Sequence, residues 1–307
     1  MILWMRRRRA ASRKAMMAWT TVAGAIALLA DVHPALPQTP LDLYRERTAM
    51  LQAGAQCRLF ETPLMNALTA GQAQARTTAL RAGASTEFLD RAAAEARAQV
   101  SAMACGSARV QQAAQRARDA YRAYGGLQRM SFPGEVGGWR ADRAMPRKSA
   151  SWRLSQDAYA GLDKVVFGLA GQNGAEAMTL SVSPTDGAAP YAARLVVRDQ
   201  AVLPAPYVKP SGAPLSARTP VRGAARVILA EARAQADPAL RPLGTRAAVA
   251  FRFPPAAEQT LQTLDPREAV SVELLYPSNR GDLVRTAFIE VGDFNAGVAF
   301  LKAAAVR

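Results

Sequence analysis

The chain has 307 residues, a hydrophobic fraction of 50% and a formal net charge of +15. This length accommodates about two domains, and the composition excludes wholesale disorder and collagen-like sequence. The single histidine, His33, lies in a segment that we expect to be removed or to remain a linker. Ser-His-Asp and Cys-His catalysis are therefore excluded, and no imidazole is left for zinc. The sequence predicts no catalytic residue, no cofactor and no metal site, and by itself it does not reveal a biochemical function.

The positive charge is spread along the chain. Residues 1–35 hold six basic residues and Asp31, so the rest of the chain has 33 basic and 23 acidic residues, a net charge of +10. Nucleic-acid-binding proteins concentrate such charge on one element with interleaved aromatic residues, and this pattern is missing. We therefore expect no nucleic acid as a partner. An envelope protein, a lipid or an anionic polymer is the expected kind of partner, with membrane contact only through the N-terminal segment or peripheral charge.

The N-terminus has the pattern of an export signal. Residues 1–14 are strongly basic, and residues 15–30 form an apolar run that is shorter than the about 20 residues of a membrane-spanning helix. We expect residues 1–35 to be a signal peptide of the ordinary secretory route, which places the protein in the bacterial periplasm. The possible cleavage sites after this run have, at position −3, a residue that signal peptidase sites do not favour. An uncleaved signal that anchors the chain in the inner membrane is therefore the alternative.

Residues 36–130 are predicted to form a bundle of about four helices. Helices are expected over 41–59, 62–83 and 85–105, followed by a fourth that ends at Gly125-Gly126. Thr62-Pro63 and Ser85 provide the start signals of the second and third helices. The apolar stripes of these helices are rich in alanine, which buries little area per residue, so the bundle is expected to have a thin core.

The two cysteines, Cys57 and Cys105, are predicted to form a disulfide. Their even number in a chain that we expect to be exported allows the bond. The second and third helices are of similar length and are joined by a short turn. The chain therefore runs out and back, and Cys105 arrives beside the end of the first helix. We expect Cα atoms within about 7 Å of each other. Two free buried thiols are the alternative.

Residues 131–153 are predicted to form a hinge that carries a contact surface. Glycines and prolines are frequent there, and the segment combines indole rings with positive charge, which suits stacking and anion binding in an interdomain groove. The candidate partner or ligand surface consists of Trp139, Arg140, Arg143 and Trp152. The alternative is that Trp139 packs into the interdomain joint.

Residues 154–307 are predicted to form an antiparallel β-sandwich or open barrel with a C-terminal helix, so the whole chain is of the α+β class. About seven strands are expected, three of which (178–182, 247–253 and 270–276) alternate in side-chain character, and most are not separated by helices of crossover length. The strands are expected over 165–169, 178–182, 194–198, 226–230, 247–253, 270–276 and 283–291. Residues 184–220 contain seven prolines and are expected to form a long loop, with short helices over 256–264 and 293–304.

The C-terminal part resembles a known family. Its order is a strand, a short helix with Leu261 and Leu264, two hairpin strands, the stretch Gly292-Asp293-Phe294-Asn295-Ala296-Gly297 and a helix with Leu301. This arrangement resembles the C-terminal half of the invasion-associated locus B family, over roughly 60 residues. The resemblance implies an exported β-sandwich protein of the alphaproteobacterial envelope. The sandwich cysteines of that family are missing here, and no functional residue is carried over.

Three carboxylates near the C-terminus, Asp282, Glu290 and Asp293, are candidates for an acid/base pair, as are Asp265 and Glu268, which flank Pro266 in a turn. Simpler roles are expected for them: a turn, an outward strand position and a helix cap. The sequence therefore favours a non-enzymatic binding or accessory protein of the cell envelope. The alternatives are a carboxylate-based enzyme that acts on an envelope polymer and a signal-anchored structural protein.

Overall fold

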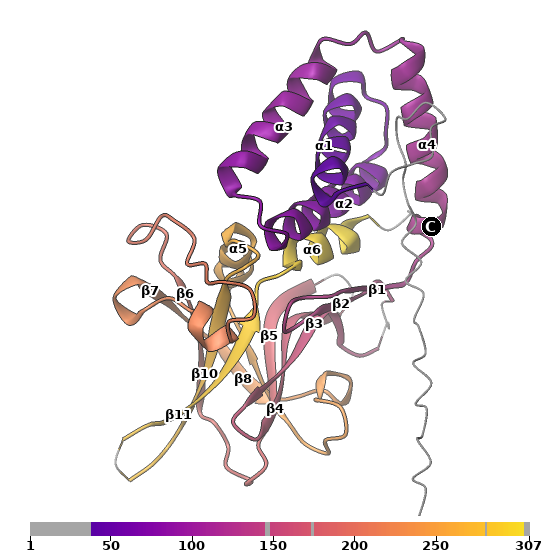
Figure 1. Cartoon of the computed structure of the whole chain (residues 1–307). Coiled ribbons are helices and arrows are strands. Elements are labelled where there is room, and N and C mark those ends of the chain that lie inside the picture. The colour runs from indigo at the N-terminus through magenta and orange to yellow at the C-terminus, as the bar shows by residue number, and fades with distance from the viewer. Residues whose placement is uncertain (1–37, 145–147, 173–174, 280, 304–307) are drawn as a thin grey trace, which may run out of the picture.

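The structure is a computed structural model that describes residues 38–144, 148–172, 175–279 and 281–303. The expected signal peptide, residues 1–35, and His33 lie outside the described residues. In the described part of the chain, no helix is both long and apolar enough to cross a membrane. Helices gather at one end of the molecule and strands at the other, with two short helices between them (Figure 1).

Four helices form the N-terminal part, as predicted. They are α1 (Pro40–Cys57), α2 (Thr62–Arg81), α3 (Thr86–Ser101) and α4 (Ala108–Gly125). Thr39 and Asp42 form a reciprocal capping box at the start of α1, and the Ser85 hydroxyl accepts the Phe88 N–H at the start of α3. Thr62 is the first helical residue of α2 rather than its cap, which is Glu61.

The predicted disulfide is confirmed. The sulfur atoms of Cys57 and Cys105 are bonded, and the Cα atoms lie 5.5 Å apart. The helices around this bond have two small apolar clusters of their own, separate from the main core. The disulfide therefore fixes the end of α1 to the turn between α3 and α4, where little apolar area is buried.

The remainder of the chain forms two antiparallel sheets and two more helices. One sheet has seven strands in the order β1-β2-β3-β4-β5-β9-β8, and the other has four in the order β11-β10-β6-β7. All pairings between the strands of these two sheets are antiparallel, and the described strands form no closed barrel. The strands are β1 (Arg129–Phe132), β2 (Trp139–Asp142), β3 (Ser151–Ala160), β4 (Asp163–Gln172), β5 (Ala175–Ser183), β6 (Ala192–Arg198), β7 (Ala225–Leu229), β8 (Ala232–Gln235), β9 (Val249–Arg252), β10 (Ala269–Tyr276) and β11 (Leu283–Glu290).

Both sheets contribute to one core. Leu154, Phe167 and Leu180 of the larger sheet belong to the same buried cluster as Leu195 and Val272 of the smaller sheet. Each of the seven predicted strands is present. The sequence missed β1, β2, β3 and β8.

The predicted hinge is not a linker. Residues 131–153 include the end of β1, all of β2 and the start of β3, which are neighbouring strands of the seven-stranded sheet. Pro133, Gly134, Gly137 and Gly138 lie in the turn between β1 and β2. A Cβ atom on Gly134 would lie 1.9 Å from the carbonyl oxygen of Gly137, so this turn requires glycine.

The last helix, α6 (Phe294–Lys302), joins the helical part to the sheets. It contacts α2 on one side and β1, β2 and β3 on the other. Phe294 and Phe300 are fully buried, and Gly297 lets the helix lie directly on Leu154 of β3. Its last carbonyls accept hydrogen bonds from Asn66 of α2 and Tyr121 of α4, so side chains of the bundle cap it.

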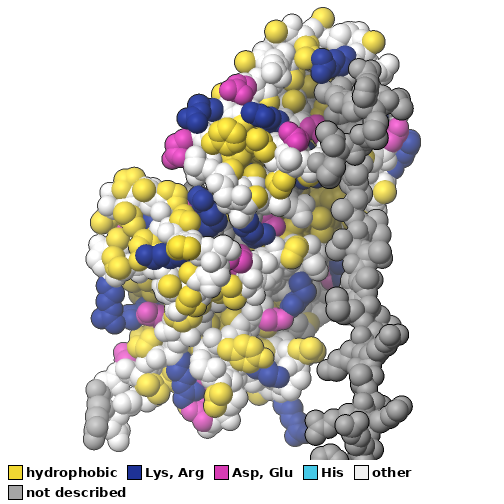
Figure 2. Space-filling model, in the orientation of Figure 1, with side chains coloured by type: hydrophobic (Ala, Val, Ile, Leu, Met, Phe, Trp, Pro, Cys, Tyr) yellow, Lys and Arg dark blue, Asp and Glu magenta, His cyan; other side chains and the backbone are white. Residues whose placement is uncertain are grey.

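The surface has no single-sign stripe on the face shown in Figure 2. Lys and Arg side chains alternate with Asp and Glu over both the helical end and the strands. This distribution agrees with the dispersed charge along the sequence.

Candidate functional site

The predicted contact surface divides into buried and exposed residues. Trp139 is 1% exposed, and its indole N–H donates to the carbonyls of Glu290 and Val291 while its ring packs edge-on against Phe294. The prediction that it lies on a partner surface is therefore wrong. An apolar ring with one donor is well suited to seal the joint between β2 and α6, which was the alternative.

Arg143 is also buried and was placed wrongly on the surface. Its guanidinium donates to Phe300 O of α6 and to three carbonyls at the end of α4, and it stacks 3.6 Å from the Phe300 ring centre. These contacts tie α4, α6 and β2 together. The C-terminal carbonyls of both helices gain a cation there, which stabilises helix ends.

The other two predicted residues stay accessible. Arg140 forms a two-pronged ion pair with Asp157 of β3, at 2.8 and 3.0 Å, and both side chains are half exposed. Trp152 is half buried and donates to Leu240 O. The structure therefore separates the four residues, two of them buried and two accessible.

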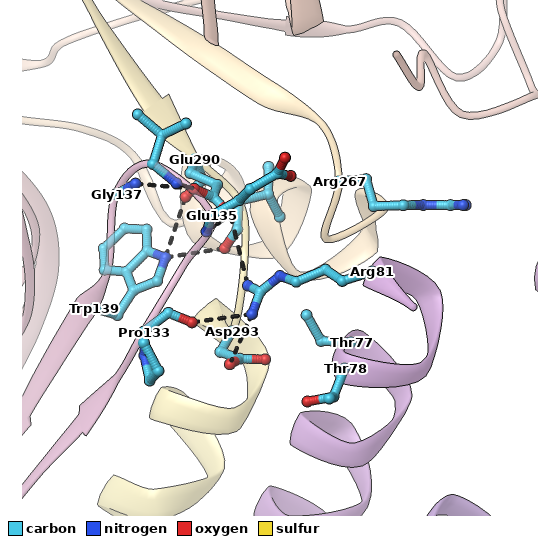
Figure 3. A network of polar contacts seen from close by, with 12 residues as sticks. Thr77, Thr78, Arg81, Pro133, Glu135, Gly137, Trp139, Arg267, Glu290 and Asp293 are labelled. Carbon is cyan, nitrogen blue, oxygen red and sulfur yellow. Dashed lines mark hydrogen bonds and ion pairs between the residues drawn. The ribbon is translucent and has the colours of Figure 1, made fainter. Parts of the chain in front are cut away.

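A network of buried polar groups lies beside Trp139 (Figure 3). The Glu290 carboxylate, from the end of β11, accepts three consecutive backbone N–H bonds, from Glu135, Val136 and Gly137, at 2.8 to 2.9 Å. Arg81 from α2 approaches it to 3.5 Å. The Glu290 side chain is 1% exposed, so the predicted outward position is wrong. This arrangement, which we call the Glu290 clamp, holds the β1–β2 turn against β11.

Asp293 completes the junction. It precedes α6 but makes no capping hydrogen bond with its side chain. Its carboxylate lies 3.9 Å from Arg81 and is 2% exposed, and burial raises its pKa to about 6. The predicted pair Glu290 and Asp293 thus meets at one arginine, while Asp282 lies beside Tyr191 at the opposite end of β11. The oxygens of Glu290 are occupied by amides, so this cluster connects elements rather than presenting a carboxylate to a substrate.

Gln156 closes the seam between the two sheets next to the clamp. Its side-chain amide accepts from the backbone N–H of Glu290 and donates to the carbonyl of the same residue, at 2.9 and 3.0 Å. The Gln156 side chain of β3 thus forms the two hydrogen bonds with the Glu290 backbone that a neighbouring strand would otherwise form.

A hollow of about 320 Å³ opens on the surface directly outside this seam. We call it the β3 groove. One wall is the β1–β2 turn, the floor is β3, and the other wall is the proline-rich segment between β6 and β7. Val136 and Tyr159 are 61% and 62% exposed at its margin. The lining consists of Val136, Gly137, Gln156, Asp157, Ala158, Tyr159, Pro214, Leu215, Ser216 and Phe288.

Both walls of the β3 groove are held by ionic contacts. Glu290 fixes the turn that carries Val136. Glu135 of the same turn pairs with the buried Arg218 at 2.8 Å and accepts from Ser211, which fixes the proline-rich wall. These hydrogen bonds, that of Arg218 above all, lower the pKa of Glu135 to about 2. The groove is therefore pre-formed, which reduces the entropy lost when a ligand binds.

A second hollow, of about 360 Å³, lies between β6, β7 and the helix α5 (Pro255–Thr263). Its lining includes no apolar side chain larger than alanine, and its Arg198 is paired with the buried Glu268. The β3 groove is thus the better candidate for binding, because ligand sites combine apolar walls with a few polar groups.

Among the described residues, no three or more His, Cys, Asp and Glu side chains are grouped to hold a metal ion. Sequence reasoning missed the groove residues Val136, Gln156 and Tyr159. One signal was present: Val136 is an apolar residue in a turn with glycines on both sides, where burial is not expected. Comparisons with protein-family models, with curated proteins and with solved structures find no match to this chain.

Proposed function

We propose that this chain is an exported protein of the bacterial cell envelope that binds a partner protein through the β3 groove and does not act by catalysis. The observation that carries the proposal is the groove itself, an apolar hollow with exposed Val136 and Tyr159 between two walls held by Glu290 and Glu135. Such a surface suits a short apolar segment of another protein. The Arg140–Asp157 pair at its rim supplies polar contacts that orient the segment.

Export is supported by independent features. The basic and apolar pattern of residues 1–30 is typical of a secretory signal, and the Cys57–Cys105 bond favours an oxidising compartment. The two sheets around a common core are interpreted as a β-sandwich, in line with the resemblance to the invasion-associated locus B family.

The carboxylate-enzyme alternative receives less support. An acid/base pair has to reach a substrate, and the side chains of Glu290 and Asp293 are 1% and 2% exposed. The signal-anchor alternative concerns residues 1–35, and an intact mass of the exported protein distinguishes it from cleavage.

The groove is tested by capture of partners from the native envelope. The variant Val136→Glu with Tyr159→Ser places charge and removes aromatic area at the groove, and we expect it to lose the partner that the unchanged protein captures. Val227→Glu is the matched control, because Val227 is 49% exposed on β7, at the other edge of the four-stranded sheet from β11.

If the double variant still captures the partner, or if the Val227 control loses it equally, the site lies elsewhere. Circular dichroism of each variant verifies that the fold is retained.

A further inference from the structure

The end of the sheets opposite to the helices is fixed by a buried aspartate. β11 runs from Leu283 to Glu290, and Glu290 contacts α2, so the start of β11 lies at the far end. There Asp163 accepts from Arg285, Tyr276 and Thr185, at 2.7, 3.0 and 2.9 Å. Asp163 begins β4, so these bonds hold the β3–β4 turn at this end, away from the helices (Figure 1).

Two leucines project from this end. Leu162 in the β3–β4 turn is 81% exposed, and Leu243 in the loop before β9 is 92% exposed, the two largest values among the exposed large hydrophobic side chains of the described residues. The ammonium group of Lys164 donates to Leu243 O at 3.1 Å, which places the two turns side by side. Each turn contains a glycine with positive φ, Gly161 and Gly244, and such tight turns keep a leucine out of the core.

The two turns that carry the leucines also contain basic residues. Lys164, Arg241 and Arg246 lie in the same two turns, and within the described part of the chain none of them forms an ion pair; Lys164 and Arg241 bond to carbonyls. The nearby Asp163 is buried and already paired with Arg285. We define the distal tip as residues 161–164 and 241–246.

We propose that the distal tip docks on an anionic phospholipid bilayer, with Leu162 and Leu243 entering the interface and the three cations contacting lipid headgroups. The shape favours a bilayer over a protein pocket, because both leucines stand on projecting turns rather than in a hollow. The charge is complementary to anionic lipid, and exposed leucine beside Lys and Arg is the composition of interfacial membrane contacts. The distal tip adjoins one end of the β3 groove, because Tyr159 pairs with Lys164 across the β3–β4 hairpin, but it includes no residue that lines the groove.

The test uses the full chain with a single added cysteine that is labelled with a polarity-sensitive fluorophore, under conditions that keep the Cys57–Cys105 bond intact. Labels are placed by Leu162→Cys, by Leu243→Cys and, as a control, by Gln112→Cys on the exposed side of α4. Vesicles of phosphatidylglycerol with phosphatidylcholine are compared with phosphatidylcholine alone. Any contribution of residues 1–37 is the same in all three proteins.

We expect a blue shift of emission at positions 162 and 243 with anionic vesicles, none at position 112, and little shift with phosphatidylcholine alone. Adding Lys164→Gln and Arg246→Gln to the labelled proteins is expected to lower the shift by more than half. Emission unchanged at 162 and 243, or an equal shift at 112, overturns the proposal. Full shifts in the charge-depleted proteins overturn the role of the cations.

Discussion

At the scale of single residues, the Glu290 clamp decides how the site is built. One carboxylate satisfies three consecutive N–H groups of the β1–β2 turn and lies beside Arg81 of α2. Buried donors without a partner are costly, and so is the loss of the partner of a buried charge such as the Glu290 carboxylate. The same side chain therefore shapes one wall of the groove and attaches the helical part to the sheets.

The first prediction concerns this clamp. Glu290→Gln keeps the shape, removes the charge and turns an N–H₂ group toward backbone donors, so we expect the free energy of unfolding to fall by about 3–5 kcal/mol. Urea unfolding measures it. Glu273→Gln is the control on the adjacent strand, because its ion pair with Arg194 is partly exposed and should contribute less than about 1 kcal/mol. Equal losses in the two variants would refute the clamp.

The second prediction concerns Asp293. Its pKa is raised to about 6 by burial, above its ordinary value of 3.8, so the folded protein holds this proton more tightly than the unfolded chain. The resulting stabilisation is complete below about pH 4 and is lost as the pH rises through 6, with a total of about 3 kcal/mol. Asp293→Asn removes this dependence. We therefore expect the wild type, relative to the variant, to lose stability between pH 4 and pH 7.5 in urea unfolding. If the unfolding free energies of the wild type and the variant change with pH in the same way, this prediction is contradicted.

At the scale of elements, the disulfide compensates for a thin helical core. The bond closes a loop between residues 48 apart in sequence, and the chain-entropy model gives about 4 kcal/mol for a loop of this length. The clusters of the helical part are small, whereas α2 is also held by α6 and the sheets.

The third prediction follows from this difference. Replacing Cys57 and Cys105 by serine should increase amide hydrogen exchange most in α1 and α3, less in α2 and least in β4. Mass-spectrometric exchange of the two proteins measures this order. Uniform deprotection of helices and sheets would show that the chain unfolds as one unit and that the bond does not act locally.

The elements that sequence reasoning found and missed differ in physical character. Long helices with caps, and strands with one buried face, have a periodicity that can be counted. β3 has no clean alternation, because the polar residues Arg153, Ser155 and Gln156 are all buried on it, and Arg153 and Gln156 form hydrogen bonds there. β1, β2 and β8 have only four residues each; β9 is equally short, but alternation over residues 247–253 revealed it.

The candidate site was less predictable than the fold. Its contacts join residues that are more than 150 positions apart, such as Glu135 and Glu290, and no local pattern reports them. A tryptophan such as Trp139 suits both a binding surface and a buried position under α6. Composition does not distinguish the two positions, so it led to the wrong placement of Trp139. The position of α6 over β2 in the folded chain decides between a surface and a buried position for this residue.

At the scale of the whole molecule, the helical end and the distal tip lie at opposite ends of the sheets, and the groove extends between them, with Tyr159 next to Lys164 of the tip. The helices attach where β11 ends, the β3 groove lies along the flank of the sheets, and the tip lies where β11 begins. A protein held on a bilayer by the tip would leave the groove open at its side, free to bind a partner at the membrane surface. The dispersed charge of the surface is compatible with this division, since local cations rather than a global field act at the tip.

The central claim is that the β3 groove is where the exported protein meets its partner. Site-specific photo-crosslinking in intact cells tests it most directly, with the photoreactive residue at Tyr159 in the groove or, as control, at Gln112 of α4. The account predicts one discrete adduct in the envelope fraction from position 159, lost when Val136→Glu is added, and none from position 112. No adduct from position 159, or the same adduct from position 112, would contradict it.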